Sequence, residues 1–484
     1  MANGYNDTGY DVVIGLEIHV ELNTKTKIFC GCSTEFGAEP NTHTCPVCTG
    51  MPGVLPVMNK GVLEKAIAAG LATNCDITQQ CKFDRKNYFY PDLPKAYQTS
   101  QLYLPICRNG WVEIDAADGG KKKVRIHQIH MEEDAGKLIH DSLNGGTLID
   151  YNRCGVPLIE IVSEPDMTCA AEAVAYFNKL RSTFQYLGIS DCKLQEGSMR
   201  ADVNLSVKKV GSDELGTRTE TKNLNSLRAM EHAIEFEIYR QIDVLEDGGK
   251  VVQETRRWDD EKGIGYAMRS KENAHDYRYF PEPDLAPMNI SDEWIAEIKG
   301  RQPEMPDEKK ARYMDEFKLS EYDADLLIRS RRLAEIFEEA TAVCNNAKTV
   351  ANFINVDCNR LLNADGAEPE NIKFEAAYLG ELVKLVDDGK INKTTAKQIF
   401  EIMYNENIDP VKYVKDNGLE MVSDDGALEK MVDEVIANNP KSVEDYKKGK
   451  KNAIGFLVGQ IMKATKGQAN AGKVNQMIQE KLNS

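Results

Sequence analysis

Residues 12–22 alternate between apolar and polar side chains without interruption, which is the pattern of a strand with one buried face. Neighbouring side chains in a strand point to opposite faces, so Glu17, His19 and Glu21 share one face. The other face is aliphatic throughout: Val12, Ile14, Leu16, Ile18, Val20 and Leu22. The segment therefore predicts a sheet near the N-terminus that carries two carboxylates and an imidazole away from its core.

An imidazole flanked at two-residue spacing by carboxylates suits a divalent cation such as Mg²⁺ or Mn²⁺. A solvated polar face is the alternative, and for Glu21 alone it is the better interpretation. Further acids favour the metal. Residues 130–134, His-Met-Glu-Glu-Asp, cluster three carboxylates that repel one another without a cation. Glu160 lies in the apolar run 157–162, where a carboxylate needs a partner unless it faces water.

A second alternating segment, residues 200–207, places four polar side chains on one strand face: Arg200, Asp202, Asn204 and Ser206. The outside of a sheet would explain this face by itself. Taken together, the strand-borne acids favour a divalent metal and phosphate chemistry. The chain has no G-x-x-x-x-G-K-[ST] or G-x-G-x-x-G loop, so any nucleotide is held in another way, and neither G-x-S-x-G nor H-E-x-x-H occurs.

Two close cysteine pairs, Cys30-x-Cys32 and Cys45-x-x-Cys48, are separated by twelve residues of polar, turn-rich chain. Four thiolates at this spacing suit a tetrahedral structural Zn²⁺, and His43 could replace one sulfur. The other eight cysteines are scattered singly and fit core or surface thiols. In a chain without a secretory signal, metal binding or burial is expected before disulfides.

The predicted secondary structure changes from β-rich to helical near residue 291. Its 484 residues predict two to four domains. Up to residue 290, β-branched runs alternate with Gly, Asn and Asp turns, and helical periodicity interrupts them at 60–71, 170–187 and 227–245. Helical segments follow at 324–328, 333–343, 350–362, 374–386 and 394–404. We therefore predict three domains, at 1–290, 291–408 and 409–484.

The formal net charge of −17 argues against a protein that coats nucleic acid nonspecifically, but a local basic patch permits an RNA partner. From Tyr446 onward the chain has eight lysines and one carboxylate. Six of these lysines fit contacts to a phosphate backbone, although a solvated basic surface is a common alternative: Lys447, Lys448, Lys450, Lys451, Lys463 and Lys466. Without a targeting signal or an apolar run of membrane-spanning length, we expect a cytoplasmic protein.

The aromatic segment 83–91, Phe-Asp-Arg-Lys-Asn-Tyr-Phe-Tyr-Pro, puts Lys86, Tyr88 and Tyr90 on one strand face. Rings beside cations stack on bases or sugars and hold phosphates. An aromatic strand face inside a core is the alternative, and on these residues alone it is slightly favoured.

Five segments resemble signatures of one family, the B subunit of the aspartyl/glutamyl-tRNA(Asn/Gln) amidotransferase: residues 12–22, 83–92, 130–137, 157–166 and 276–284. The resemblance covers nearly the whole chain, and residues 456–470 are similar to the family's YqeY-like tail. Ala471 departs from the pattern, because the family tail usually continues with Pro after Asn470. We expect a small change in the turn at this point.

The resemblance implies an α+β fold with an N-terminal antiparallel β-rich cradle domain, which is catalytic, an all-α middle domain and a small helical tail that binds tRNA. It implies a carbon–nitrogen ligase that binds misacylated Glu-tRNA(Gln) or Asp-tRNA(Asn) and phosphorylates the side-chain carboxylate with ATP. Ammonia from glutamine, channelled from an amidase A subunit, then displaces phosphate. A small C subunit completes a heterotrimer.

Matching motifs imply Mg²⁺ ligands at Glu17, His19, Glu133 and Glu160. They place Arg200 and Asp202 nearby among the catalytic residues, and Lys86, Tyr88 and Tyr90 around ATP or the aminoacyl end. The cysteine pairs resemble the zinc-bearing branch of the family. Two other functions stay open: a zinc-knuckle RNA-binding module without catalysis, and a metal-dependent nuclease.

Overall fold

The computed structural model describes residues 8–141, 145–194, 196–270, 277–421, 425–447, 452–465, 469 and 471–483. The chain forms two compact units, Met1–Met305 and Pro306–Ser484. The boundary lies beyond the predicted change from β-rich to helical at residue 291, because helix α4 (Asp292–Gly300) packs on α1 (Lys60–Ala72) and buries Ile298 in the core of the first unit.

The first unit is built on a nine-stranded sheet with β1 near its centre. In spatial order the strands are β14 (Ile264–Ser270), β13 (Glu254–Asp259), β12 (Thr219–Lys222), β11 (Met199–Lys209), β1 (Tyr10–Glu21), β10 (Pro157–Ser163), β7 (Lys121–Glu133), β6 (Cys107–Asp115) and β2 (Asp76–Ile77). Neighbours are antiparallel, as expected, except that β12 and β13 are parallel. The exception arises because α3 (Leu227–Glu246) connects these two strands as a crossover helix.

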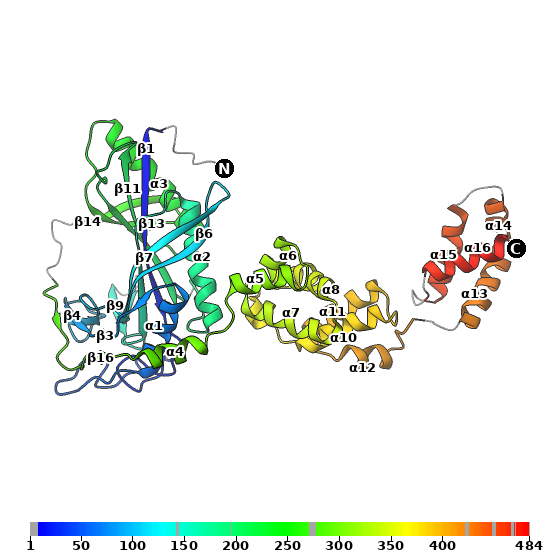
Figure 1. Ribbon diagram of the computed structural model, residues 1–484, viewed down its shortest axis with the longest axis horizontal. Helices are drawn as coiled ribbons and strands as arrows, with labels where there is room; N and C mark the ends of the chain where they lie inside the picture. The colour runs from blue at the N-terminus through cyan, green and yellow to red at the C-terminus, as the bar shows by residue number, and fades with distance from the viewer. Residues whose placement is uncertain are drawn as a thin grey trace. The chain divides into compact units, whose positions relative to one another are not determined.

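Three helices cover one face of this sheet: α1, α3 and α2 (Ala170–Leu187) (Figure 1). All three were predicted from helical periodicity and are confirmed. The Ser226 side chain caps α3 by accepting from the Ala229 amide, and Gly188 ends α2 in the left-handed conformation. The aliphatic face of β1 is buried beneath these helices, with Ile14, Ile18 and Val20 fully buried, so its polar face lies on the other side.

Three small sheets complete the first unit. One joins β15 (Phe280–Pro281), β4 (Asp84–Asn87) and β5 (Tyr97–Ser100), and β5 also contacts β7. The other two are the pair β16 (Met288–Asn289) with β3 (Gln80–Cys81) and the hairpin of β8 (Lys137–Asp141) with β9 (Gly146–Asp150).

The second unit is helical, as predicted. Its helices up to residue 416 are α5 (Pro306–Asp315), α6 (Glu321–Leu327), α7 (Arg331–Cys344), α8 (Ala347–Asn352), η3 (Phe353–Cys358), α9 (Asn359–Asp365), η4 (Pro369–Asn371), α10 (Ala376–Asp387), α11 (Lys393–Glu406) and α12 (Pro410–Asp416). The predicted helix at 350–362 is interrupted by η3, a π-helical segment that periodicity does not reveal.

Four further helices form the C-terminal part of the second unit: α13 (Asp425–Asn438), α14 (Pro440–Lys447), α15 (Asn452–Ala464) and α16 (Ala471–Asn483). They share a small core of their own, which includes Leu428, Leu457, Ile461 and Val474. Across the described ranges, none of the helices combines the length and apolar character that crossing a membrane requires.

Candidate active site

The polar face of β1 meets polar side chains on its neighbours in direct register. His19 is opposite Glu160 on β10, and Glu160 is opposite His130 on β7. His19 Nε2 lies 3.5 Å from Glu160 Oε2, which lies 3.1 Å from His130 Nε2. Strand alternation and register therefore bring an imidazole–carboxylate–imidazole row onto the face that the helices leave open.

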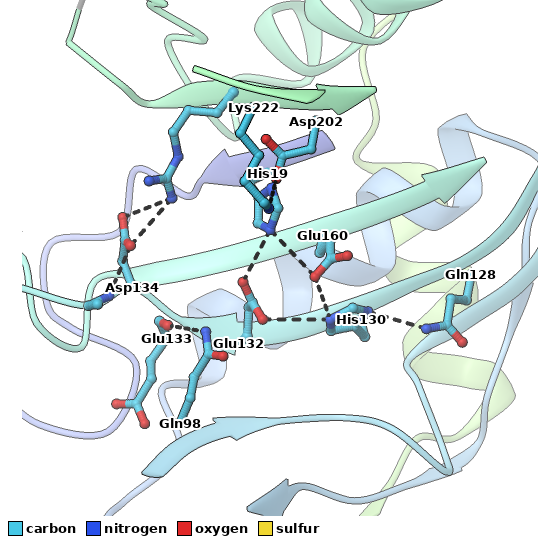
Figure 2. Close-up of polar contacts among 12 residues, drawn as sticks. His19, Gln98, Gln128, His130, Glu132, Glu133, Asp134, Glu160, Asp202 and Lys222 are labelled. Carbon is cyan, nitrogen blue, oxygen red and sulfur yellow. Dashed lines mark hydrogen bonds and ion pairs between the residues drawn. The ribbon is translucent and has the colours of Figure 1, made fainter. Parts of the chain in front are cut away.

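Glu132, two residues beyond His130 on the same strand face, completes the group (Figure 2). Its carboxylate oxygens lie 3.7 Å from His19 Nε2 and 3.6 Å from His130 Nε2. Ligand atoms of His19, Glu132 and Glu160 all lie within 4.8 Å of one another. We call these three residues the acidic cluster. The sequence singled out residues 130–134 as acidic, but the family motifs implied Glu133 as the ligand and not Glu132 or His130.

Mutual contacts within and around the acidic cluster shift its ionisation. Burial lowers the pKa of His19 and of His130, but hydrogen bonds and the negative charge of Glu160 outweigh burial, and both pKa values are raised, that of His130 to about 10. Burial opposes ionisation of Glu160, yet the two imidazoles hold its pKa well below the usual range. The side chains thus form a concentrated set of charges.

Glu17 lies at the edge of this arrangement. It is opposite Asp202 on β11, and its carboxylate accepts a hydrogen bond from Asn204 Nδ2 at 2.9 Å. Burial, followed by the charges of Glu160 and Glu220, raises the pKa of Glu17. Glu17, Asp202 and Glu220 form a second group of close carboxylates. The structure therefore brings Glu17, His19, Glu160 and Asp202 to one face, as the sequence predicted.

Glu133 points to the opposite side of β7. Its carboxylate forms a buried ion pair with Lys95 and accepts a hydrogen bond from the Thr99 amide at 2.9 Å. The structure does not bring Glu133 to the acidic cluster. Arg200 is opposite His19 on β11, and its guanidinium lies 3.3 Å from Asp134.

A cavity of about 560 Å³ opens over the acidic cluster. Its walls include cations from four strands: Lys86, Arg200, Lys222 and Arg257. Lys222 is held 2.6 Å from Asp202. Tyr88 also lines this cavity, and Lys86 Nζ lies 4.9 Å from the ring centre of Tyr277. Tyr90 is not among the lining residues and is 53% exposed.

The acidic cluster fits a divalent cation. Two carboxylates and an imidazole provide the oxygen and nitrogen ligands that Mg²⁺ or Mn²⁺ prefers. Beside burial, the charges of Glu160 and Glu220 raise the pKa of Glu17, so negative charge accumulates on this face. A bound cation would relieve that repulsion.

Cys30, Cys32, Cys45 and Cys48 converge, with one sulfur from each within 4.8 Å of the others. All four are free thiols, and the Sγ atoms of Cys45 and Cys48 lie 3.9 Å apart. A hydrogen bond from Cys30 is the main cause that lowers the pKa of Cys48 to about 4. A thiolate ready at neutral pH fits the predicted Zn²⁺. The His43 side chain does not belong to this group.

Two of the predicted tRNA-binding lysines lie at the ends of tail helices. Lys447 is the last residue of α14 and Lys463 lies in the last turn of α15, and both side chains are exposed. The remaining four, Lys448, Lys450, Lys451 and Lys466, lie outside the described residues.

Comparison with known proteins gives a consistent result. Residues 12–296 match the model of the GatB/GatE catalytic domain, and residues 335–482 match that of the GatB domain, which is YqeY-like. The B subunit of the aspartyl/glutamyl-tRNA(Asn/Gln) amidotransferase of Lachnospira eligens is 63% identical over 479 residues, covering 98% of this chain and 99% of that protein. The corresponding proteins of Lachnoclostridium phytofermentans and Caldicellulosiruptor bescii are 60% and 58% identical with the same coverage.

Proposed function

The chain belongs to the GatB/GatE family of tRNA-dependent amidotransferase B subunits, and from this premise we propose that it activates a tRNA-bound carboxylate with ATP. Its family role is that of one subunit of a carbon–nitrogen ligase with several subunits. The proposed substrates are Glu-tRNA(Gln) and Asp-tRNA(Asn). The proposed products are Gln-tRNA(Gln) and Asn-tRNA(Asn).

The observation that carries this proposal is the acidic cluster on the floor of a cavity with cationic walls. Phosphoryl transfer needs charge neutralisation and positioning more than covalent help. His19, Glu132 and Glu160 would hold Mg²⁺, which supplies neutralisation of the phosphate charge. Lys86 on the cavity wall would attract the polyphosphate, and Glu17 and Asp202 border the cluster.

Two steps follow for the substrate side chain. Its carboxylate oxygen attacks the γ-phosphorus of ATP, the bond to the bridging oxygen breaks, and ADP leaves with an acyl phosphate formed. Ammonia then attacks the acyl carbon, and inorganic phosphate leaves with one oxygen from the original carboxylate. Unprotonated ammonia must reach this carbon, so a protected path from its source is required.

Partners follow from the same proposal. An amidase A subunit would release ammonia from glutamine, and a small C subunit would complete the heterotrimer. The tail would contact tRNA through Lys447 and Lys463, together with the predicted lysines beyond the described residues. The zinc site at the four cysteines would stabilise the fold and take no part in the chemistry.

The test is amidation by the purified heterotrimer with ATP, glutamine and each misacylated tRNA in turn. We expect the amide product, and ATP hydrolysis that depends on misacylated tRNA. tRNA binding without amidation of either substrate would instead support an RNA-binding module. Cleaved tRNA on a denaturing gel would support a nuclease.

A further inference from the structure

A row of neighbouring residues crosses the open face of the sheet from β1 to the edge strand β14. Glu17 is opposite Asp202, and Lys222 on β12 is ion-paired with Asp202. Arg257 on β13 is opposite Lys222, and Tyr266 on β14 is opposite Arg257. Four strand spacings separate the ends of this row, about 19 Å in total.

Arg257 is a cation of the row whose side chain is not paired with a carboxylate of the described residues. Its exposed side chain lines the cavity above the acidic cluster. Among the residues that the structure describes, none forms a hydrogen bond or an ion pair with the Arg257 guanidinium. By contrast, Lys222 is ion-paired with Asp202, and Arg200 with Asp134. No carboxylate in the described ranges neutralises the Arg257 guanidinium, so it can pair with an anionic ligand that enters the cavity.

Two large side chains beside Arg257 are about half exposed to solvent. Tyr266 is 43% exposed and Met268 is 56% exposed. Tyr266 is opposite Arg257 on the neighbouring strand, and Met268 lines the same cavity as Arg257, so both side chains lie beside the guanidinium. A ring and a thioether beside a guanidinium form the kind of surface on which a protein stacks an unpaired nucleobase.

We propose that Arg257, Tyr266 and Met268 bind the 3′-terminal nucleotide of the tRNA, an inference that rests on the proposed function. Tyr266 stacks on the terminal base and Arg257 contacts the adjoining phosphate. The amino acid, esterified to the ribose of that nucleotide, then extends along the row towards the acidic cluster. We call Arg257, Tyr266 and Met268 the Tyr266 platform. Because β14 is an edge strand, the tRNA can reach this platform from outside the sheet. The adenine of ATP is the competing ligand.

The experiment uses the purified heterotrimer with Tyr266→Ala, Tyr266→Phe or Arg257→Ala in this chain. The matched control is Tyr239→Ala, which removes a tyrosine of similar exposure (50%) from α3 on the other face of the sheet. Steady-state amidation gives the KM for Glu-tRNA(Gln) and the KM for ATP separately. Fluorescence of tRNA(Gln) with 2-aminopurine in place of its terminal adenine reports stacking directly.

We expect Tyr266→Ala to raise the KM for Glu-tRNA(Gln) about 5- to 150-fold, the range of base–aromatic stacking, with an unchanged KM for ATP. The 2-aminopurine signal should be quenched by wild type, Tyr266→Phe and Tyr239→Ala but not by Tyr266→Ala. Arg257→Ala should raise the same KM, and its effect should shrink as salt increases.

Three results would overturn the proposal: a raised KM for ATP alone, unchanged KM values for both substrates, or failure of Tyr266→Ala to assemble with the other subunits. The first would assign the platform to ATP, and the last would assign it to a protein interface. An inactive wild-type complex would instead refute the proposed function. Active wild type with unaffected variants refutes only this inference.

Discussion

Glu132 and Glu133 are consecutive residues whose carboxylates lie on opposite faces of β7. Glu132 lies 3.7 Å from His19 Nε2 on the open face, whereas Glu133 accepts from the Thr99 amide on the other side. One residue thus belongs to the acidic cluster, and its neighbour belongs to a buried ion pair with Lys95. The two substitutions to glutamine should therefore have different consequences.

Glu132→Gln should lower the affinity for Mn²⁺ at least about tenfold, because it removes a charged ligand while preserving shape. Glu133→Gln should leave this affinity unchanged. Titration followed by the electron paramagnetic resonance signal of free Mn²⁺ measures both. Glu113→Gln, at an exposed position on β6, is the matched control. The reverse ranking of Glu132 and Glu133 would restore Glu133 as the ligand.

Lys95→Met should destabilise the first unit by about 3–5 kcal/mol, since it leaves the Glu133 carboxylate buried without its cation. Adding Glu133→Gln to Lys95→Met should recover part of the loss. Denaturant unfolding followed by tryptophan fluorescence reports this unit alone, because all three tryptophans, Trp111, Trp258 and Trp294, lie within it. Equal stability of wild type and Lys95→Met would contradict the account.

The two glutamates also show where reasoning from sequence stops. Strict alternation predicted β1 and its buried face, whereas the meeting of Glu160 with Glu17 and His19 was implied only by the family resemblance. On β7 the buried positions change from even numbers, Val124 and Ile126, to odd numbers, Ile129 and Met131. The pairing with β10 shifts register at this point. Such an irregularity reverses which side chains of β7 face the cavity, and the sequence contains no pattern from which it could be predicted.

Other features of the fold had clearer signals. Helical periodicity and polar turns located α1, α2 and α3, whereas the parallel pair β12 and β13 depends on how α3 packs back onto the sheet. No sequence motif identifies the Tyr266 platform. Its position follows from strand order alone, which brings residues far apart in the sequence into one row.

Zinc should be present at one ion per chain, and Cys45→Ser should reduce this content and lower the melting temperature of the first unit. Elemental analysis of the purified chain measures the content, and tryptophan fluorescence on heating measures stability. Cys344→Ser, at a partly buried thiol of α7, is the control. A chain that contains no zinc and still melts like wild type would contradict a structural site.

Glu338 on α7 should make the stability of the second unit depend on pH. Burial opposes its ionisation, but Lys309 at 2.6 Å, Tyr313 and Arg312 lower its pKa below 4.5. Its contribution is therefore complete above pH 4.5 and disappears as the pH falls through the lower folded value. Glu338→Gln should cost roughly 1–2 kcal/mol at pH 7, and this cost should shrink as the pH falls below 4.5.

Calorimetry combined with tryptophan fluorescence measures this effect. All three tryptophans lie in the first unit, so a calorimetric transition that no fluorescence change accompanies is the unfolding of the second unit. Glu339→Gln, an exposed neighbour, provides the control. A constant difference between wild type and Glu338→Gln from pH 3 to pH 7 would show that the carboxylate contributes by shape and not by charge.

Transfer of oxygen from substrate to phosphate tests the central claim most directly. The heterotrimer is supplied with ATP, glutamine and Glu-tRNA(Gln) in which both oxygens of the side-chain carboxylate are ¹⁸O, and the inorganic phosphate is analysed by mass spectrometry. If this chain phosphorylates the carboxylate, each amide formed releases one phosphate with one ¹⁸O atom, and Glu132→Gln forms neither product. Amide formation with phosphate that contains no ¹⁸O would contradict the acyl phosphate and the role assigned to the acidic cluster.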